Sequence, residues 1–333
     1  MIRQSVRLLP GIALLVAGAA LAHGLSATLL GINELLVAVG LGVLLGNVVG
    51  VPEWASAGLN TQKLWLETGI VLMGARIAIG QLFAVGVELL ALVVGFLAFS
   101  LLFVEVVARN VFGIPERLGS LLAAGYSVCG VSAIVAVSSG VRAKSEQIAY
   151  AVGTILLFDA VTLAVYPAIG RFLDLPDIVF GTWAGISMVS TGPVVAAGFA
   201  YSPQAGQWAT VTKLGRNVFI GVVAVCYAVY YARRYGTDSG ADDWRYLWSQ
   251  FPKFVVGFVI VAAVASVGLL TEADVARLEA TYQWLFLLAF VGLGTNIELA
   301  TMRKTGVQPL LVVLTALVTV SALSLLASLV VFA

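Results

Sequence analysis

Long apolar runs separated by short polar segments fill the chain from end to end. Because a membrane-spanning helix needs about 20 mostly apolar residues, this pattern predicts about eleven transmembrane helices, and hence an all-α polytopic membrane protein. The predicted spans lie near residues 8–25, 33–50, 61–81, 86–108, 119–139, 146–170, 178–199, 206–232, 252–270, 282–302 and 308–331.

Eleven spans can be divided into one extra helix (residues 1–30) and two five-helix repeats (residues 31–172 and 173–333) of a single membrane domain. An odd number of helices per repeat inverts the second repeat in the membrane relative to the first, as in many secondary transporters. The fifth and tenth spans then occupy equivalent places.

Small and polar residues interrupt the fifth span. The stretch from Ser127 to Gly140 reads SVCGVSAIVAVSSG, and its candidate binding residues are Ser127, Cys129, Gly130 and Ser132. Irregular backbone at membrane depth is tolerated only where protein surrounds it or water reaches it, so we expect a discontinuous helix that binds a solute here. The alternative is a continuous helix whose small residues allow close helix packing.

The tenth span reads AFVGLGTNIELA, where Gly294, Thr295 and Asn296 interrupt the apolar run in a similar way. We expect the two discontinuous helices to cross near the middle of the membrane and to form the binding site. A helix restart capped by Ser132 or Thr295 would present N–H groups to an anion, whereas unwound carbonyls suit Na⁺. The interruptions therefore predict an ion site without fixing the sign of the ion.

The composition agrees with a membrane protein and excludes several other classes. Hydrophobic residues make up 61% of the chain and the mean hydropathy is +1.04, against roughly 45–50% apolar residues in soluble domains. The formal net charge of +1 gives no reason to expect nucleic acid. Two cysteines without CxxC spacing and a single histidine argue against a disulfide framework or a metal centre, and no cofactor is expected.

The placement of the basic residues predicts the orientation. Setting aside Arg76, Lys213 and Arg216 as intramembrane, twelve of the remaining fifteen Lys and Arg residues fall on the side of the N-terminus. The positive-inside rule then places the protein in the cell membrane with the N-terminus cytoplasmic and the C-terminus outside. In this assignment Arg117 is cytoplasmic, whereas Arg142 and Lys144 are external.

Ionisable residues inside spans are costly, so each is a candidate for function. Lys213 and Arg216, in KLGR, share one helix face, and two cations there suit an anion. The alternative is a structural network with Glu67, Asp159 or backbone carbonyls. Asp159 lies in an apolar span, so it is either protonated or paired with a cation. It is either a coupling carboxylate or a hydrogen-bonded structural acid.

Other features are expected to be structural. The spacings of Lys63 with Glu67 and of Glu105 with Arg109 are those of local helix ion pairs, and Arg76 is expected to extend to the interface. Gly42, Gly46 and Gly50 form a strip on one face of the second span, which predicts an internal helix contact; a homodimer interface is the alternative.

Four segments in this order resemble the sulfate exporter family of YeiH-type membrane proteins: GLNTQKLWLETGIVLMGARI (58–77), SVCGVSAI (127–134), PVVAAG (193–198) and KLGR (213–216). That family is grouped with the cation/proton antiporter and anion transporter clan, and the resemblance implies a transporter with two crossed, broken helices. The chain departs from the family pattern at Val189, Ser190 and Pro193, where relatives usually carry polar or titratable residues. Ser190 and Thr191 would keep part of a polar lining.

The leading hypothesis is therefore a secondary transporter that exports sulfate or a related sulfur oxyanion, with H⁺ or Na⁺ as the candidate coupling ion. A sodium or cation/proton antiporter using Asp159 is the alternative, and a passive channel is a third hypothesis. An intramembrane enzyme is not expected, because the sequence contains no GxSxG motif and no zinc-ligand cluster.

Overall fold

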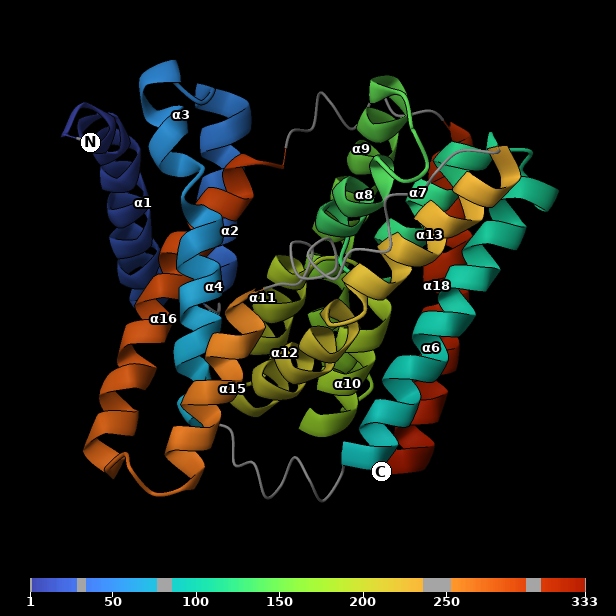
Figure 1. The fold of residues 1–333 in the computed structure, drawn as a ribbon. Coiled ribbons are helices and arrows are strands. Elements are labelled where there is room, and N and C mark those ends of the chain that lie inside the picture. The colour runs from blue at the N-terminus through green and yellow to red at the C-terminus, as the bar shows by residue number, and fades with distance from the viewer. Residues whose placement is uncertain (1, 29–33, 77–85, 236–252, 298–306, 333) are drawn as a thin grey trace. The chain divides into compact units, whose positions relative to one another are not determined.

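A computed structural model describes residues 2–28, 34–76, 86–235, 253–297 and 307–332 (Figure 1). Every regular element in these ranges is a helix. Five of the described helices are long and apolar enough to cross a membrane, at Leu8–Ser26, Gly86–Val111, Ser145–Phe172, Pro203–Tyr235 and Val307–Phe332. The expectation of an all-α protein with apolar spans is confirmed, while the count of eleven is not.

The helices form two compact units, Met1–Val85 with Lys253–Ala300 and Gly86–Pro252 with Thr301–Ala333. These units do not coincide with the predicted halves 31–172 and 173–333. A compact unit and a sequence repeat are different divisions of a chain, so the repeat stays a prediction.

The first unit combines helices from two segments of the chain, Met1–Val85 and Lys253–Ala300. They are α1 (Ile2–Thr28), α2 (Glu34–Leu44) with the π-helical turn η1 (Leu45–Val49), α3 (Glu53–Leu59), α4 (Gln62–Met73) with the 3-10 turn η2 (Gly74–Arg76), α15 (Lys253–Ser266) and α16 (Glu272–Thr295). Helix α16 packs against α1, α2 and α4, and α15 packs against α4.

The glycine strip of the second span makes an internal contact. A Cβ atom on Gly42 would lie 2.1 Å from the carbonyl oxygen of Val291, and one on Gly46 would lie 2.7 Å from that of Thr295. Both glycines therefore allow α2 to approach the backbone of α16, as predicted. Gly50 has a φ of +78° and no atom within 4 Å of its would-be Cβ, so it belongs to a turn rather than to the contact.

The helix of the tenth span ends where the sequence predicts an interruption, and its continuation lies outside the described residues. Helix α16 runs without a break through Gly294 and ends at Thr295, with Asn296 as its C-cap. A Cβ on Gly294 would lie 2.2 Å from the Val39 carbonyl, so this glycine serves close packing on α2. Residues 298–302 of the predicted span lie outside the described residues.

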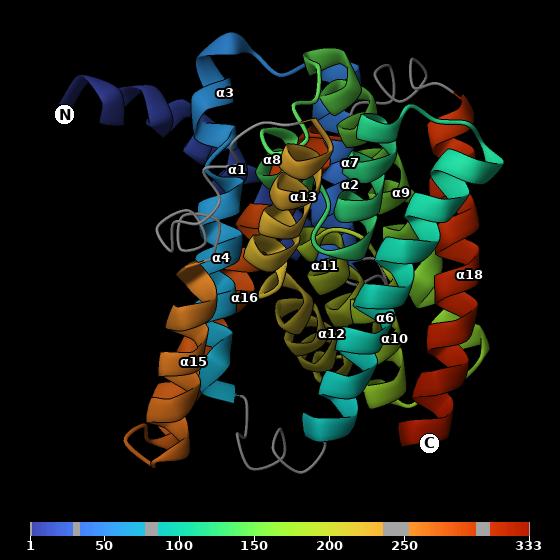
Figure 2. The same ribbon diagram turned by 45° about the vertical axis from the view of Figure 1, so that its right-hand side comes forward.

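The second unit contains the remaining helices. They are α6 (Gly86–Val106) with the π-helical turn η3 (Val107–Val111), α7 (Glu116–Ser127), α8 (Val131–Ser138), α9 (Ser145–Phe172), α10 (Asp177–Ser187), α11 (Thr191–Tyr201), α12 (Pro203–Asn217), α13 (Ile220–Tyr235) and α18 (Val307–Phe332). Helices α6 and α18 lie side by side in Figures 1 and 2, and α12 packs against α10 and α11.

Helices α7 and α8 form a hairpin instead of a broken helix that crosses the membrane. Arg117, at the start of α7, donates through Nη1 to the carbonyl oxygen of Arg142, beyond the end of α8, at 2.9 Å. A Cβ on Gly125 of α7 would lie 2.8 Å from Cγ1 of Ile134 of α8, so the two helices pack against each other. The predicted break is present, but the chain turns back at it, and the assignment of Arg117 and Arg142 to opposite sides is wrong.

Helices α10 and α11 form a second hairpin of the same kind. Arg171, in the last turn of α9, donates to the carbonyl oxygen of Ala200 at the end of α11, at 2.6 Å. The rings of Phe180 and Tyr201 stack with centroids 4.0 Å apart. The start of α10 and the end of α11 therefore lie together, and the predicted span at 178–199 is also not a crossing.

The two hairpins enter the second unit from opposite ends. The 28-residue helix α9 begins at Ser145, beside the base of the first hairpin, and ends at Phe172, beside the base of the second. A helix of this length measures about 42 Å. In Figures 1 and 2, α7 and α8 occupy one end of the unit and α10 and α11 the other. Non-helical backbone at the hairpin tips is compatible with lipid surroundings because protein encloses it.

Candidate functional site

The chain turns at Gly130 at the tip of the first hairpin. Gly130 has a φ of +66° and ψ of −129°, a conformation that is strained for any residue with a Cβ. A Cβ there would also lie 2.1 Å from Oγ of Ser190. Since Ser190 is the N-cap of α11, the tips of the two hairpins are in contact.

The tip of the second hairpin consists of Met188 and Val189, followed by Ser190 as the N-cap of α11. Pro193 is the third residue of α11, where a helix needs no backbone N–H donor. The sequence predicts one continuous span over residues 178–199, whereas a helix begins just before Pro193. The signal was present, because Ser190 and Thr191 followed closely by a proline are typical of a helix N-terminus.

Arg216 joins the two tips. Its side chain is 1% exposed at the end of α12, and its N–H groups donate only to backbone carbonyls. On the first hairpin the acceptors are Tyr126 O at 2.8 Å and Ser127 O at 2.7 Å and 3.0 Å. On the second they are Gly185 O and Met188 O, both at 3.0 Å, and Ile186 O. The guanidinium thus satisfies the C-terminal carbonyls of α7 and α10 together.

Lys213 and Asp159 act on the second tip from two other helices. The Lys213 ammonium donates to Met188 O at 3.1 Å and to Val189 O. One carboxylate oxygen of Asp159 accepts a hydrogen bond from the backbone N–H of Ser190 at 2.9 Å. Asp159 lies at the middle of α9, so the tips meet about halfway along the unit.

Asn217 completes the contacts at the start of α11. Its Nδ2 donates to Oγ1 of Thr191 at 3.0 Å. Asn217 is 4% exposed, and its Oδ1 has no hydrogen-bond partner within the described part of the chain. Asn217 is not among the predicted site residues, although this residue directly follows Arg216 in a helix with two buried cations.

The charge at the tips is unbalanced. Lys213, Arg216 and Asp159 are the only charged side chains that are fully buried among the residues described. With their ordinary charges they leave one net positive charge in the interior of the second unit. Such a charge is costly unless a further partner is supplied.

The structure gathers most of the predicted site residues at these tips. Ser127, Cys129 and Gly130 lie at the first tip with Ser132 in the first turn of α8, Ser190 and Thr191 lie at the second, and Asp159, Lys213 and Arg216 surround them. Gly294, Thr295 and Asn296 belong to the first unit instead, and their grouping with the tips stays a prediction. The hydrogen bonds of Arg216 and of Lys213 both follow the structural alternative, because their acceptors are backbone carbonyls.

The predicted local ion pairs are confirmed. Lys63 lies 3.7 Å from Glu67, and Arg109 lies 2.6 Å from Glu105. Arg76 lies 3.3 Å from Glu279 and its side chain stays partly exposed, so its extension to the interface stays a prediction.

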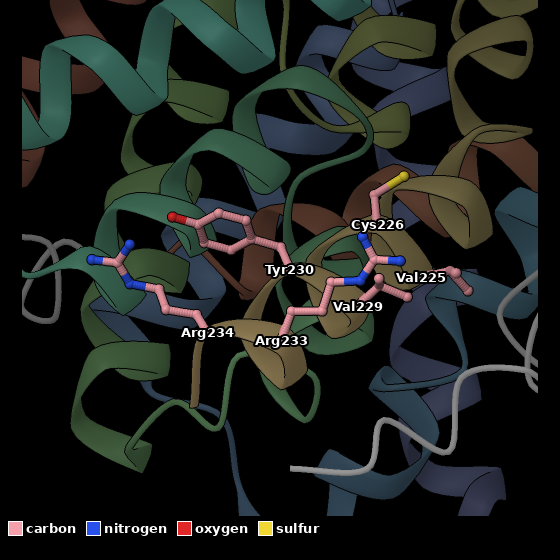
Figure 3. A pocket seen from close by; sticks show the side chains of 6 residues that line it. All are labelled: Val225, Cys226, Val229, Tyr230, Arg233 and Arg234. Atoms are coloured by element: carbon pink, nitrogen blue, oxygen red, sulfur yellow. The ribbon is translucent and has the colours of Figure 1, made fainter. Parts of the chain in front are cut away.

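An open hollow of about 650 Å³ lies on α13, away from the predicted site residues (Figure 3). It is lined by Val225, Cys226, Val229, Tyr230, Arg233 and Arg234. The Tyr230 hydroxyl and the Arg234 guanidinium both interact with Glu116, at 3.2 Å and 3.4 Å. These polar groups therefore belong to a surface network, and none of the predicted site residues lines the hollow.

Comparisons with known proteins place the chain in a family. The family described as "Conserved hypothetical protein 698" matches residues 10–313. The chain belongs to this family. A UPF0324 membrane protein of Nitratidesulfovibrio vulgaris is 33% identical over 86% of this chain and 81% of its own length. The UPF0324 inner membrane protein YeiH of Escherichia coli O6:H1 is 30% identical over 92% of this chain and 89% of its own length. The resemblance to YeiH-type proteins is confirmed.

The chain also matches part of a longer relative and aligns with a solved structure. Another UPF0324 protein of N. vulgaris is 32% identical, and the match spans only 51% of its length. Among solved structures, the sodium proton antiporter MjNhaP1 from Methanocaldococcus jannaschii aligns over 97% of this chain and 99% of its own, at 14% identity and a TM-score of 0.30. A TM-score this low establishes no shared fold, and no functional argument follows from it.

Proposed function

We propose that this membrane protein is a secondary transporter that exports a small anion, sulfate or a related sulfur oxyanion. The observation that carries the proposal is that two basic side chains and only one acidic side chain are buried where the two helical hairpins meet, within the described residues. Secondary transporters bind their substrates near the midplane, at helices that are interrupted there. The sequence contains no GxxxxGK[ST] motif for nucleotide binding, so an ion gradient is the expected source of energy.

The first tip is the better place for an anion. Asp159 occupies the N–H of Ser190 at the second tip, whereas the N-cap of α8, Gly130, has no side chain to satisfy the first N–H groups of that helix. The Ser127 hydroxyl is also buried there and has no partner among the residues described. Backbone N–H groups, a hydroxyl and the field of the two cations together suit an oxyanion.

A cation/proton antiporter is the second candidate, and Asp159 is the observation that favours it. A carboxylate halfway along a spanning helix, in contact with a hairpin tip, is placed to exchange a proton or a cation during transport. In this case a change of Asp159 to Asn would abolish coupled cation flux, and loss of the Lys213 charge would have the smaller effect.

Flux measurements in liposomes test the anion proposal. Purified protein should release labelled sulfate faster than protein-free liposomes and with saturable kinetics. Lys213→Met should reduce this flux severely, while Lys63→Ala, which changes an exposed lysine of the first unit, should leave it unchanged. Absence of sulfate, sulfite and thiosulfate flux under Na⁺ and H⁺ gradients of either direction would reject the proposal, and flux that does not saturate would indicate a channel.

A further inference from the structure

Several side-chain oxygen atoms remain available at the second tip. The backbone N–H of Ser190 donates to Asp159, and Nδ2 of Asn217 donates to Thr191. These two bonds leave side-chain oxygen atoms with free lone pairs at the start of α11. What remains is the carboxylate of Asp159, the hydroxyls of Ser190 and Thr191, and Oδ1 of Asn217.

The Asn217 oxygen is the most informative of these atoms. It is buried and has no hydrogen-bond partner within the described ranges, and its amide group is directed at the start of α11 by the 3.0 Å bond to Thr191. Buried polar atoms are nearly always satisfied, so one without a partner indicates an ordered water or a bound ion. An oxygen atom in this position calls for a donor or a cation.

The chemistry of the available oxygen atoms decides between a water and a cation. Carboxylate, hydroxyl and amide oxygens are the ligands that hard cations prefer, and no nitrogen or sulfur ligand is needed. A single carboxylate carries too little charge for a divalent ion, and the Lys213 ammonium on the neighbouring carbonyls of Met188 and Val189 makes a second positive charge unfavourable. A monovalent cation adds the smallest positive charge to the site, and an anion at the first tip would offset it.

We propose that Asp159, Ser190, Thr191 and Asn217 form a binding site for Na⁺ at the tip of the second hairpin. This assigns Ser190 and Thr191 to a cation and leaves the first tip to the anion. As a coupling site it rests on the proposed transport function, since Na⁺ in this place would be the ion that drives anion movement. Binding of Na⁺ by itself does not depend on that function.

The site can be tested by thermal unfolding of the purified protein in detergent. NaCl is titrated against choline chloride at constant total chloride, so that only the cation changes. Because a ligand that binds the folded state raises its stability, the unfolding midpoint of the wild-type protein should rise with Na⁺ and saturate. Equilibrium binding of labelled sodium provides the second measurement.

Three variants separate a cation ligand from a structural role. Asn217→Ala should raise the half-saturating Na⁺ concentration by more than about tenfold. Asn217→Asp keeps an oxygen at the site and should retain Na⁺ binding. Thr182→Val, which removes another buried hydroxyl without a partner in the described residues, is the matched control and should bind Na⁺ as the wild type does.

The outcomes are distinct from those of the flux assay. Stabilisation by Na⁺ and choline to the same extent, or unchanged Na⁺ binding in Asn217→Ala, would overturn the site. If Asn217→Ala does not fold, loss of Na⁺ binding in Asn217→Asp would overturn it instead. Sodium binding without flux of sulfate, sulfite or thiosulfate would support the sodium site and reject the anion transporter. Flux of one of these anions without sodium binding would support the transporter and reject the sodium site.

Discussion

Lys213 and Asp159 stabilise opposite sides of one gap in the helical backbone. The ammonium contacts the carbonyls of Met188 and Val189, where α10 has ended, and the carboxylate accepts the N–H of Ser190, where α11 begins. A positive charge at a helix C-terminus and a negative charge at a helix N-terminus each oppose the local dipole. The second tip is therefore held in the protein interior by two charges of opposite sign.

This arrangement predicts energetic coupling between Lys213 and Asp159. Lys213→Met leaves the Val189 carbonyl without its donor, since Met188 keeps its bond from Arg216, and Asp159→Asn keeps an acceptor but removes the charge, so each should destabilise the protein, the first more than the second. In the double variant neither charge is left uncompensated, so the cost should fall short of the sum by roughly 0.5–3 kcal/mol. Denaturant unfolding in detergent measures the cycle, and strict additivity would mean that the two charges do not act on one element.

Arg216 should be more sensitive to a conservative change than its charge suggests. A lysine has three donors on one atom and cannot reach the carbonyls of both hairpins, so Arg216→Lys leaves several buried acceptors unsatisfied. We expect a loss of about 3–5 kcal/mol in the free energy of unfolding. Arg76→Lys, in the partly exposed pair with Glu279, is the control and should cost less than about 1 kcal/mol. Similar effects of both changes would show that Arg216 does not join the tips.

Gly130→Ala should disrupt the contact between the tips. The backbone conformation alone costs roughly 1–3 kcal/mol for a residue with a Cβ, and the new methyl group would overlap Oγ of Ser190. Adding Ser190→Ala removes the overlapping oxygen but not the backbone strain, so the double variant should recover only part of the stability. Gly86→Ala, at the start of α6 where a Cβ meets no atom within 4 Å, is the matched control. Full recovery in the double variant would mean that the backbone at Gly130 is not strained.

The sequence predicts the chemistry of the site better than its geometry. Small and polar residues around Gly130 indicate a break because local sequence decides whether a helix can continue. The same pattern does not tell whether the chain continues across the membrane or turns back, since that depends on contacts such as Arg117 with Arg142. Gly294 packs closely on α2 and also lies one residue before the end of α16, and the sequence alone does not distinguish these two uses of a glycine. The Arg216 bonds connect residues about 90 positions apart in sequence, which no local pattern encodes.

The hairpins also change the expected orientation of the second unit and give a last prediction. Because Arg142 lies beside Arg117, the end of the unit that carries the first hairpin includes Arg109, Arg117, Arg142, Lys144, Arg233 and Arg234, whereas Arg171 lies at the other end. The positive-inside rule then makes the first end cytoplasmic. In a Cys226→Ser background, Lys144→Cys should react with a membrane-impermeant maleimide only after the cells are opened, and Arg171→Cys should react in intact cells. The opposite labelling pattern would invert the unit, and labelling of both residues from outside would contradict the passage of α9 through the membrane.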